Sequence, residues 1–188
     1  MGTLRKIVRE GLTAELLSIS GAILAAVGLA KMAGLLEEIP GLLVMTPGML
    51  AIRGSIAGSL SARIGTGLHT GTIEPQLRLE GEVLSNVVAA LTLGTLESAL
   101  IGLLSHLLII YSGFTSAGLD VLLFISVVGG TLASVVQAGF SVALAIWVFQ
   151  RGVDPDSVMG PIVTTTGDFV CVISMYLTAR IALNIFRG

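Results

Sequence analysis

One carboxylate stands close to two hydroxyls inside a long apolar stretch, residues 158–186. Thr164 and Thr165 precede Asp168 by four and three residues, so a helix would place all three side chains on the same side. Such oxygen ligands suit hard divalent cations, and Mg²⁺ keeps several of its waters while one or two carboxylates hold it. The pattern predicts a cation site with Asp168 as its main ligand. Two alternatives stay open, because Asp168 could instead be protonated or paired with a basic residue.

The basic residue that could form such a pair is Arg53, which lies in a second apolar stretch, residues 41–64. A proline precedes it, and Gly54 and Ser55 follow it directly. Proline, glycine and hydroxyl residues kink a membrane helix or let it pack closely. We therefore expect Gly54 and Ser55 to add oxygen ligands to the cation site, with Arg53 as the alternative charge partner of Asp168.

Glu97 lies in the middle of a third apolar stretch, residues 82–110. An ionised side chain in hydrocarbon costs at least about 2.5 kcal/mol, so Glu97 is a candidate second cation or proton site. An interhelical hydrogen bond would explain it equally well. Three other polar residues near the ends of apolar stretches are expected to be interfacial or packed: Glu15, His106 and Asp120.

Asp154 and Asp156 flank a proline between the last two apolar stretches. They could form a secondary cation site on the cytoplasmic side of the membrane. The alternative is a helix start, because acidic residues there complement the helix dipole.

The composition requires a membrane environment, since 54% of the 188 residues are hydrophobic and only 12% are charged. A helix needs about 20 apolar residues to cross a bilayer. The expected fold is all-α, a polytopic membrane bundle of about five helices. The five stretches that meet this length are 13–34, 41–64, 82–110, 119–149 and 158–186.

Basic residues set the expected orientation, because loops rich in Lys and Arg stay in the cytoplasm. An N-in, C-out arrangement in the cell membrane is favoured, and residues 1–12 are expected to be an interfacial amphipathic helix. With the N-terminus inside, Arg5, Lys6, Arg9, Arg63, Arg78 and Arg151 fall on the cytoplasmic side, and Lys31, Arg180 and Arg187 fall outside.

The same sequence argues against two classes of function. A net charge of −2 without a basic run excludes a nucleic-acid binder, which leaves membrane lipid as the expected surroundings. No nucleophile and base constellation, phosphate-binding loop or Cys/His metal cluster is present in the sequence. We therefore expect neither enzymatic activity nor an organic cofactor.

Residues 152–168, GVDPDSVMGPIVTTTGD, resemble the membrane domain of the MgtE family of magnesium channels and its SLC41 relatives. The shared pattern is an Asp-Pro turn, a later proline, a Thr-Thr pair and an aspartate. A second likeness lies in the stretch 41–64, where Pro47 and the Arg53-Gly54-Ser55 segment fit the family. Ser55 departs from it, because asparagine is usual there.

The resemblance implies that residues 1–188 are one MgtE-like transmembrane domain, without the family's cytosolic N and CBS domains. It implies a dimer, formed with a second copy or with a related half, around an ion path lined by Asp168. Mg²⁺ would be the transported ion, by channel or by coupled exchange. Two other functions stay open: a secondary transporter of another cation or small solute, and a membrane subunit that transports nothing.

Overall fold

The computed structural model describes residues 2–152 and 155–186. Every regular element in these two ranges is a helix, which confirms the all-α prediction. Five of the helices are long, and α2 is a short helix of 6 residues before α3. The elements are α1 (Gly2–Lys31), α2 (Ala33–Glu38), α3 (Leu42–Thr70), α4 (Gly81–Tyr111), α5 (Leu119–Gln150) and α6 (Pro155–Phe186).

Four helices are long and apolar enough to cross a membrane: α3, α4, α5 and, within α6, Val158–Phe186. They coincide with four of the five expected spans. The remaining expected span lies in α1, whose apolar described part, Ser18–Lys31, is shorter than a full crossing. Residues 2–12 begin this same continuous helix, so their predicted interfacial position, like the N-in orientation, stays a prediction.

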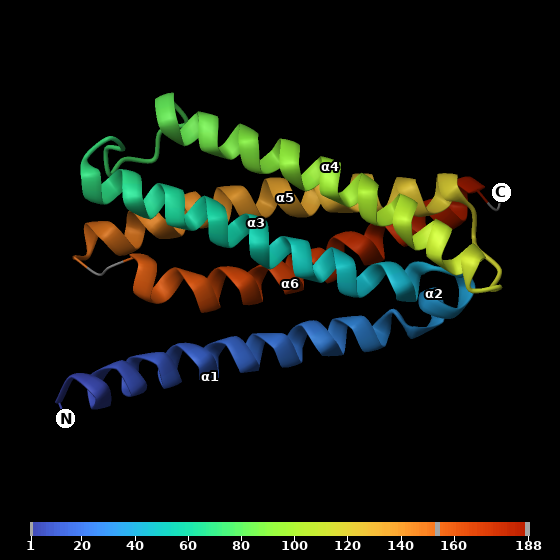
Figure 1. The fold of residues 1–188 in the computed structure, drawn as a ribbon, viewed down its shortest axis with the longest axis horizontal. Helices are drawn as coiled ribbons and strands as arrows, with labels where there is room; N and C mark the ends of the chain where they lie inside the picture. Colours follow the sequence, from blue (N-terminus) through green and yellow to red (C-terminus); the bar gives the residue numbers. More distant parts are fainter. Residues whose placement is uncertain (1, 153–154, 187–188) are drawn as a thin grey trace.

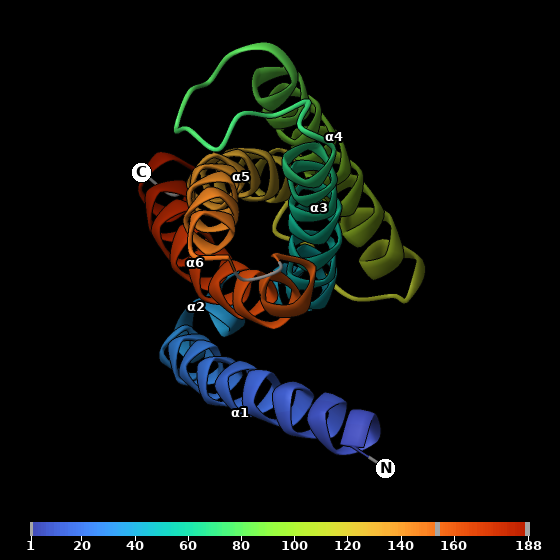
Figure 2. The ribbon, with the colours of Figure 1, turned by 90° about the vertical axis from the view of Figure 1, so that its left-hand side faces the viewer.

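The long helices run side by side along the long axis of the molecule (Figure 1). Viewed from the end, α3, α4, α5 and α6 gather into a bundle, and α1 lies outside it (Figure 2). Among the long helices, α1 contacts α6 alone within the described part of the chain. Helix α6 is therefore placed between α1 on one side and α3 and α5 on the other.

Glycine and serine pair at the contacts between α4 and α5. Gly94 lies against the Ser134 hydroxyl, and Gly130 lies against the Ser98 hydroxyl, so close that neither glycine has room for a Cβ. Between membrane helices lipid removes the hydrophobic drive, and close backbone approach through small residues supplies the packing instead. The buried Arg53 donates hydrogen bonds to the serine hydroxyls and the glycine carbonyls at these contacts.

Both prolines of the expected site regions lie inside helices, Pro47 in α3 and Pro161 in α6. Each removes one backbone donor, yet both helices continue past the proline. Around them, hydroxyls bond back to carbonyls one turn earlier: Thr46 to Leu42, Thr164 to Gly160 at 2.9 Å, and Thr166 to Ile162. The expected close packing is present, because Gly48 of α3 lies against the Ile101 side chain of α4.

Candidate functional site

Helices α3 and α6 meet where Gly54 lies against Thr164. A Cβ on Gly54 would stand 3.3 Å from Cγ2 of Thr164 and 3.9 Å from its Oγ1. Two residues that the sequence assigned to the same cation site, from spans more than 100 positions apart, are thus neighbours. Thr164 is exposed within this chain, and its hydroxyl bonds to its own helix.

Asp168 follows Thr164 by one turn of α6 and is only half-buried. Among the described residues, its carboxylate makes no hydrogen bond and no ion pair. An ionised carboxylate in hydrophobic surroundings is costly when it has no partner. Asp168 is thus an acid that this chain alone leaves without compensation.

Thr165 faces a different neighbour from Thr164. Its Oγ1 donates to the backbone oxygen of Ser18 at 3.3 Å and meets the Ser18 hydroxyl at 3.0 Å. Gly21 of α1 lies in close contact with the Thr165 methyl group. The two threonines therefore diverge: Thr164 contacts α3, Thr165 contacts α1, and in helical projection Asp168 falls between these directions.

Arg53 is 1% exposed, and its guanidinium bonds to α4 and α5. Its Nη1 donates to the Gly130 carbonyl at 2.8 Å and to the Ser134 hydroxyl, both on α5. Its Nη2 donates to α4, to the Gly94 carbonyl at 3.2 Å and the Ser98 hydroxyl at 2.9 Å. The alternative pair with Asp168 is not formed in the described structure, and neutral oxygens surround the guanidinium instead.

Glu97 is not part of the cluster formed by Gly54, Thr164 and Asp168. Glu97 is half-buried on α4, and α4 and α6 make no contact within the described residues. Glu97 therefore lies on a helix that does not touch the helix of Asp168, next to the Ser98 that binds Arg53. Ser55 is exposed on α3, beside Gly54.

The acids of the predicted cytoplasmic site are largely outside what the structure describes. Asp154 lies outside the described residues, and for Asp156, in the first turn of α6, the side chain is not described. The residues expected to be unremarkable fit that expectation where they are described. Glu15 and Asp120 are exposed, and the Nδ1 of His106 meets the Ser116 hydroxyl at 2.9 Å.

Sequence reasoning missed Gln137, a polar residue buried in α5. Its Nε2 donates to the backbone oxygen of Val163 on α6 at 2.9 Å. The signal was present, because Gln137 is an amide in the middle of the most apolar helix. Sequence alone gave no reason to connect it with α6.

Among the described side chains, no three His, Cys, Asp or Glu residues gather as a metal centre. The cluster of Gly54, Thr164 and Asp168 offers one carboxylate and one hydroxyl oxygen. Such a set suits contact with a hydrated cation, because Mg²⁺ retains most of its waters when few carboxylates bind it.

The family comparison decides the class of protein. The sequence model of the family described as "MgtE: Divalent cation transporter" matches residues 46–178. The chain belongs to the MgtE family. The matched MgtE region runs from α3 to α6 and contains Gly54, Thr164 and Asp168. With its apolar spanning helices, this MgtE-family chain is a multi-pass membrane protein for divalent cation transport. No curated protein matches it.

Proposed function

We propose that the protein transports Mg²⁺ along a path between two copies of the chain, with Asp168 of each copy lining the path. The observation that carries the proposal is a surface of small and polar residues on two apolar helices, which we name the α3–α6 polar surface. It consists of Ala51, Ser55, Ser59, Ala62 and Thr66 on α3, and Gly160, Thr164 and Asp168 on α6; all are exposed except the half-buried Asp168.

The α3–α6 polar surface differs from the outward side of α4, where large apolar side chains are exposed. Leu93, Leu96, Leu100 and Leu104 of α4 are each more than half exposed, as suits contact with lipid tails. A carboxylate in a spanning segment faces a protein interior or water. Small residues in turn favour a closely packed helix neighbour. A second copy of the chain provides that neighbour.

A two-fold axis at this surface would bring the same residues of both copies together. Two Asp168 carboxylates would then face a common path, with Thr164 and Ser55 hydroxyls near it. Two carboxylates hold a hydrated Mg²⁺ through its water shell, and they repel each other when the ion leaves. This mutual repulsion supplies the drive to admit the next cation.

Mg²⁺ uptake into liposomes tests the proposal. The protein is reconstituted, its oligomer is measured by mass in detergent, and uptake is compared for wild type, Asp168→Asn and Asp120→Asn. Asp120 is a matched control, because it is an exposed acid at the start of α5. We expect uptake by wild type and Asp120→Asn and none by a correctly assembled Asp168→Asn.

Two results would overturn the proposal. Undiminished uptake by Asp168→Asn would remove Asp168 from the path. Absence of Mg²⁺ uptake by the assembled wild-type protein, with uptake of another cation or solute, would assign the chain a different substrate.

A further inference from the structure

Gln137 places a polar amide deep among the helices. It is 4% exposed and belongs to α5, the most apolar of the spanning helices. A buried amide without a partner costs several kcal/mol in hydrocarbon, so its bond matters to the fold. That bond is the one from Nε2 to the Val163 carbonyl of α6.

The Val163 carbonyl belongs to the turn of α6 that carries the ion-path residues. In an α-helix it already accepts the backbone N–H of Gly167, so the Gln137 amide is its second donor. Thr164 follows Val163 directly, and Asp168 follows Gly167 directly. One side chain of α5 therefore holds the backbone that orients both residues.

Gly167 makes this contact sterically possible. The Gln137 amide occupies the space in which a Cβ on residue 167 would lie. Because the obstructing atoms are the far end of a flexible side chain, an alanine at 167 would displace the amide rather than the helix. The amide would then leave the Val163 carbonyl.

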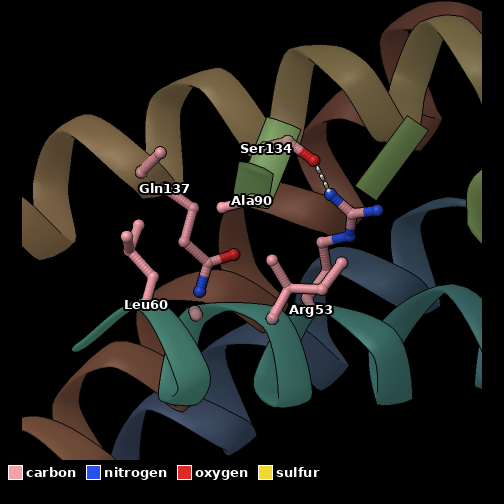
Figure 3. A pocket seen from close by; sticks show the side chains of 8 residues that line it. Arg53, Leu60, Ala90, Ser134 and Gln137 are labelled. Carbon is pink, nitrogen blue, oxygen red and sulfur yellow. Dashed lines mark hydrogen bonds between the residues drawn. The ribbon is translucent and has the colours of Figure 1, made fainter. Parts of the chain in front are cut away.

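The amide oxygen of Gln137 is turned toward Arg53 (Figure 3). Both residues line a cavity of about 10 Å³, together with Ser134. In the described structure the Nε of Arg53 is buried and has no hydrogen-bond partner, and a space of this size holds about one water. Arg53, anchored to α4 and α5, thus gives the Gln137 side chain a fixed polar neighbour.

We propose that Gln137 is a positioning residue of the ion path, which fixes the Val163–Asp168 turn of α6 through the Val163 carbonyl and thereby sets the discrimination between divalent cations. This inference rests on the proposed transport function. It differs from a purely structural role in one measurable respect: loss of the Gln137 bond changes which cation passes, and not only how much protein is folded.

The test compares Mg²⁺ and Ca²⁺ uptake by reconstituted wild type, Gln137→Ala, Gly167→Ala and Ser141→Ala. Ser141 is the matched control, one turn further along α5, fully buried, with a hydroxyl that has no partner in the described structure. We expect both Gln137→Ala and Gly167→Ala to shift the Mg²⁺ to Ca²⁺ uptake ratio about fivefold, the factor that corresponds to one hydrogen bond of about 1 kcal/mol. Ser141→Ala should keep the wild-type ratio.

The double variant sharpens the test. Once Gln137→Ala has removed the amide, Gly167→Ala meets no obstruction, so it should cause no further shift in the ratio. Additive shifts, or variants that lower Mg²⁺ and Ca²⁺ uptake in equal proportion with their folded fraction, would overturn the proposal.

A second readout separates this inference from the proposed function. Thr164→Cys, placed in a Cys171→Ser background, gives an exposed thiol whose rate of labelling by a hydrophilic maleimide reports the position of the turn. We expect Gln137→Ala and Gly167→Ala to change that rate and Ser141→Ala to leave it unchanged. If wild type transports no divalent cation, the proposed function fails, and equal labelling rates in all variants would overturn the positioning role independently.

Discussion

Arg53 donates a hydrogen bond to the backbone oxygen of Gly130 at 2.8 Å, so its charge lies against α5 and not against the carboxylate of Asp168 on α6. Its other acceptors are one carbonyl and two hydroxyls. The buried arginine of α3 therefore finds all four of its hydrogen-bond acceptors among neutral groups. Asp168 is left unpaired within the described chain, which the proposed role of its carboxylate as a cation ligand requires.

Substitutions of Arg53 should separate charge from hydrogen bonding. A lysine keeps the cost of burying a charge but has three donors and no planar fork, so it cannot reproduce the four bonds of Arg53. We expect Arg53→Lys to lower the free energy of unfolding by about 1–3 kcal/mol. Arg53→Met should cost less, because it also removes the buried charge.

Both serine acceptors have other partners when Arg53 is replaced by Met. The Ser98 and Ser134 hydroxyls also bond to the Gly94 and Gly130 carbonyls of their own helices. Thermal unfolding in detergent measures the ranking. A methionine variant less stable than the lysine variant would show that the positive charge itself stabilises the bundle.

Gly54 should be intolerant of bulk. Its contact with Thr164 leaves room for at most a methyl group, so Gly54→Leu would push α3 away from α6 and lower Mg²⁺ uptake strongly, with Gly54→Ala affected much less. Gly139→Leu is the control, because Gly139 is exposed on α5 with nothing within 4 Å of a Cβ. Equal uptake by the two leucine variants would contradict the close α3–α6 contact.

Glu97 tests whether the path has a second acid. Since α4 does not touch α6 in the described structure, we expect Glu97→Gln to retain Mg²⁺ uptake close to that of wild type. The measurement is liposome uptake beside Asp168→Asn. Loss of uptake in Glu97→Gln, with normal assembly, would restore Glu97 as the second cation ligand that its position in the sequence suggested.

The sequence predicted much of the scaffold, because a membrane span is specified by length and apolarity alone. Four spans are confirmed on that basis, and Gly54 and Thr164, assigned to the same site, lie together. The partners of Arg53 could not be predicted. Ser98 and Ser134 are ordinary small residues in apolar helices, and only the packing of α4 on α5 shows that their hydroxyls meet a guanidinium.

Thr164 and Thr165 show a second limit. Their spacing from Asp168 allowed one shared face, but adjacent helical residues point about 100° apart. In this structure that angle divides them between α3 and α1. Spacing restricts which residues share a side of a helix, and the neighbouring helices decide what each one contacts.

Disulfide cross-linking combined with uptake tests most directly whether an Mg²⁺ path runs between two copies of the chain at the α3–α6 polar surface. In a Cys171→Ser background, Ser55→Cys is compared with Leu104→Cys on the outward side of α4. We expect a cross-linked dimer for Ser55→Cys alone, with Mg²⁺ uptake that falls on oxidation and returns on reduction. Cross-linking through Leu104→Cys instead, or uptake unchanged by the Ser55→Cys cross-link, would contradict it.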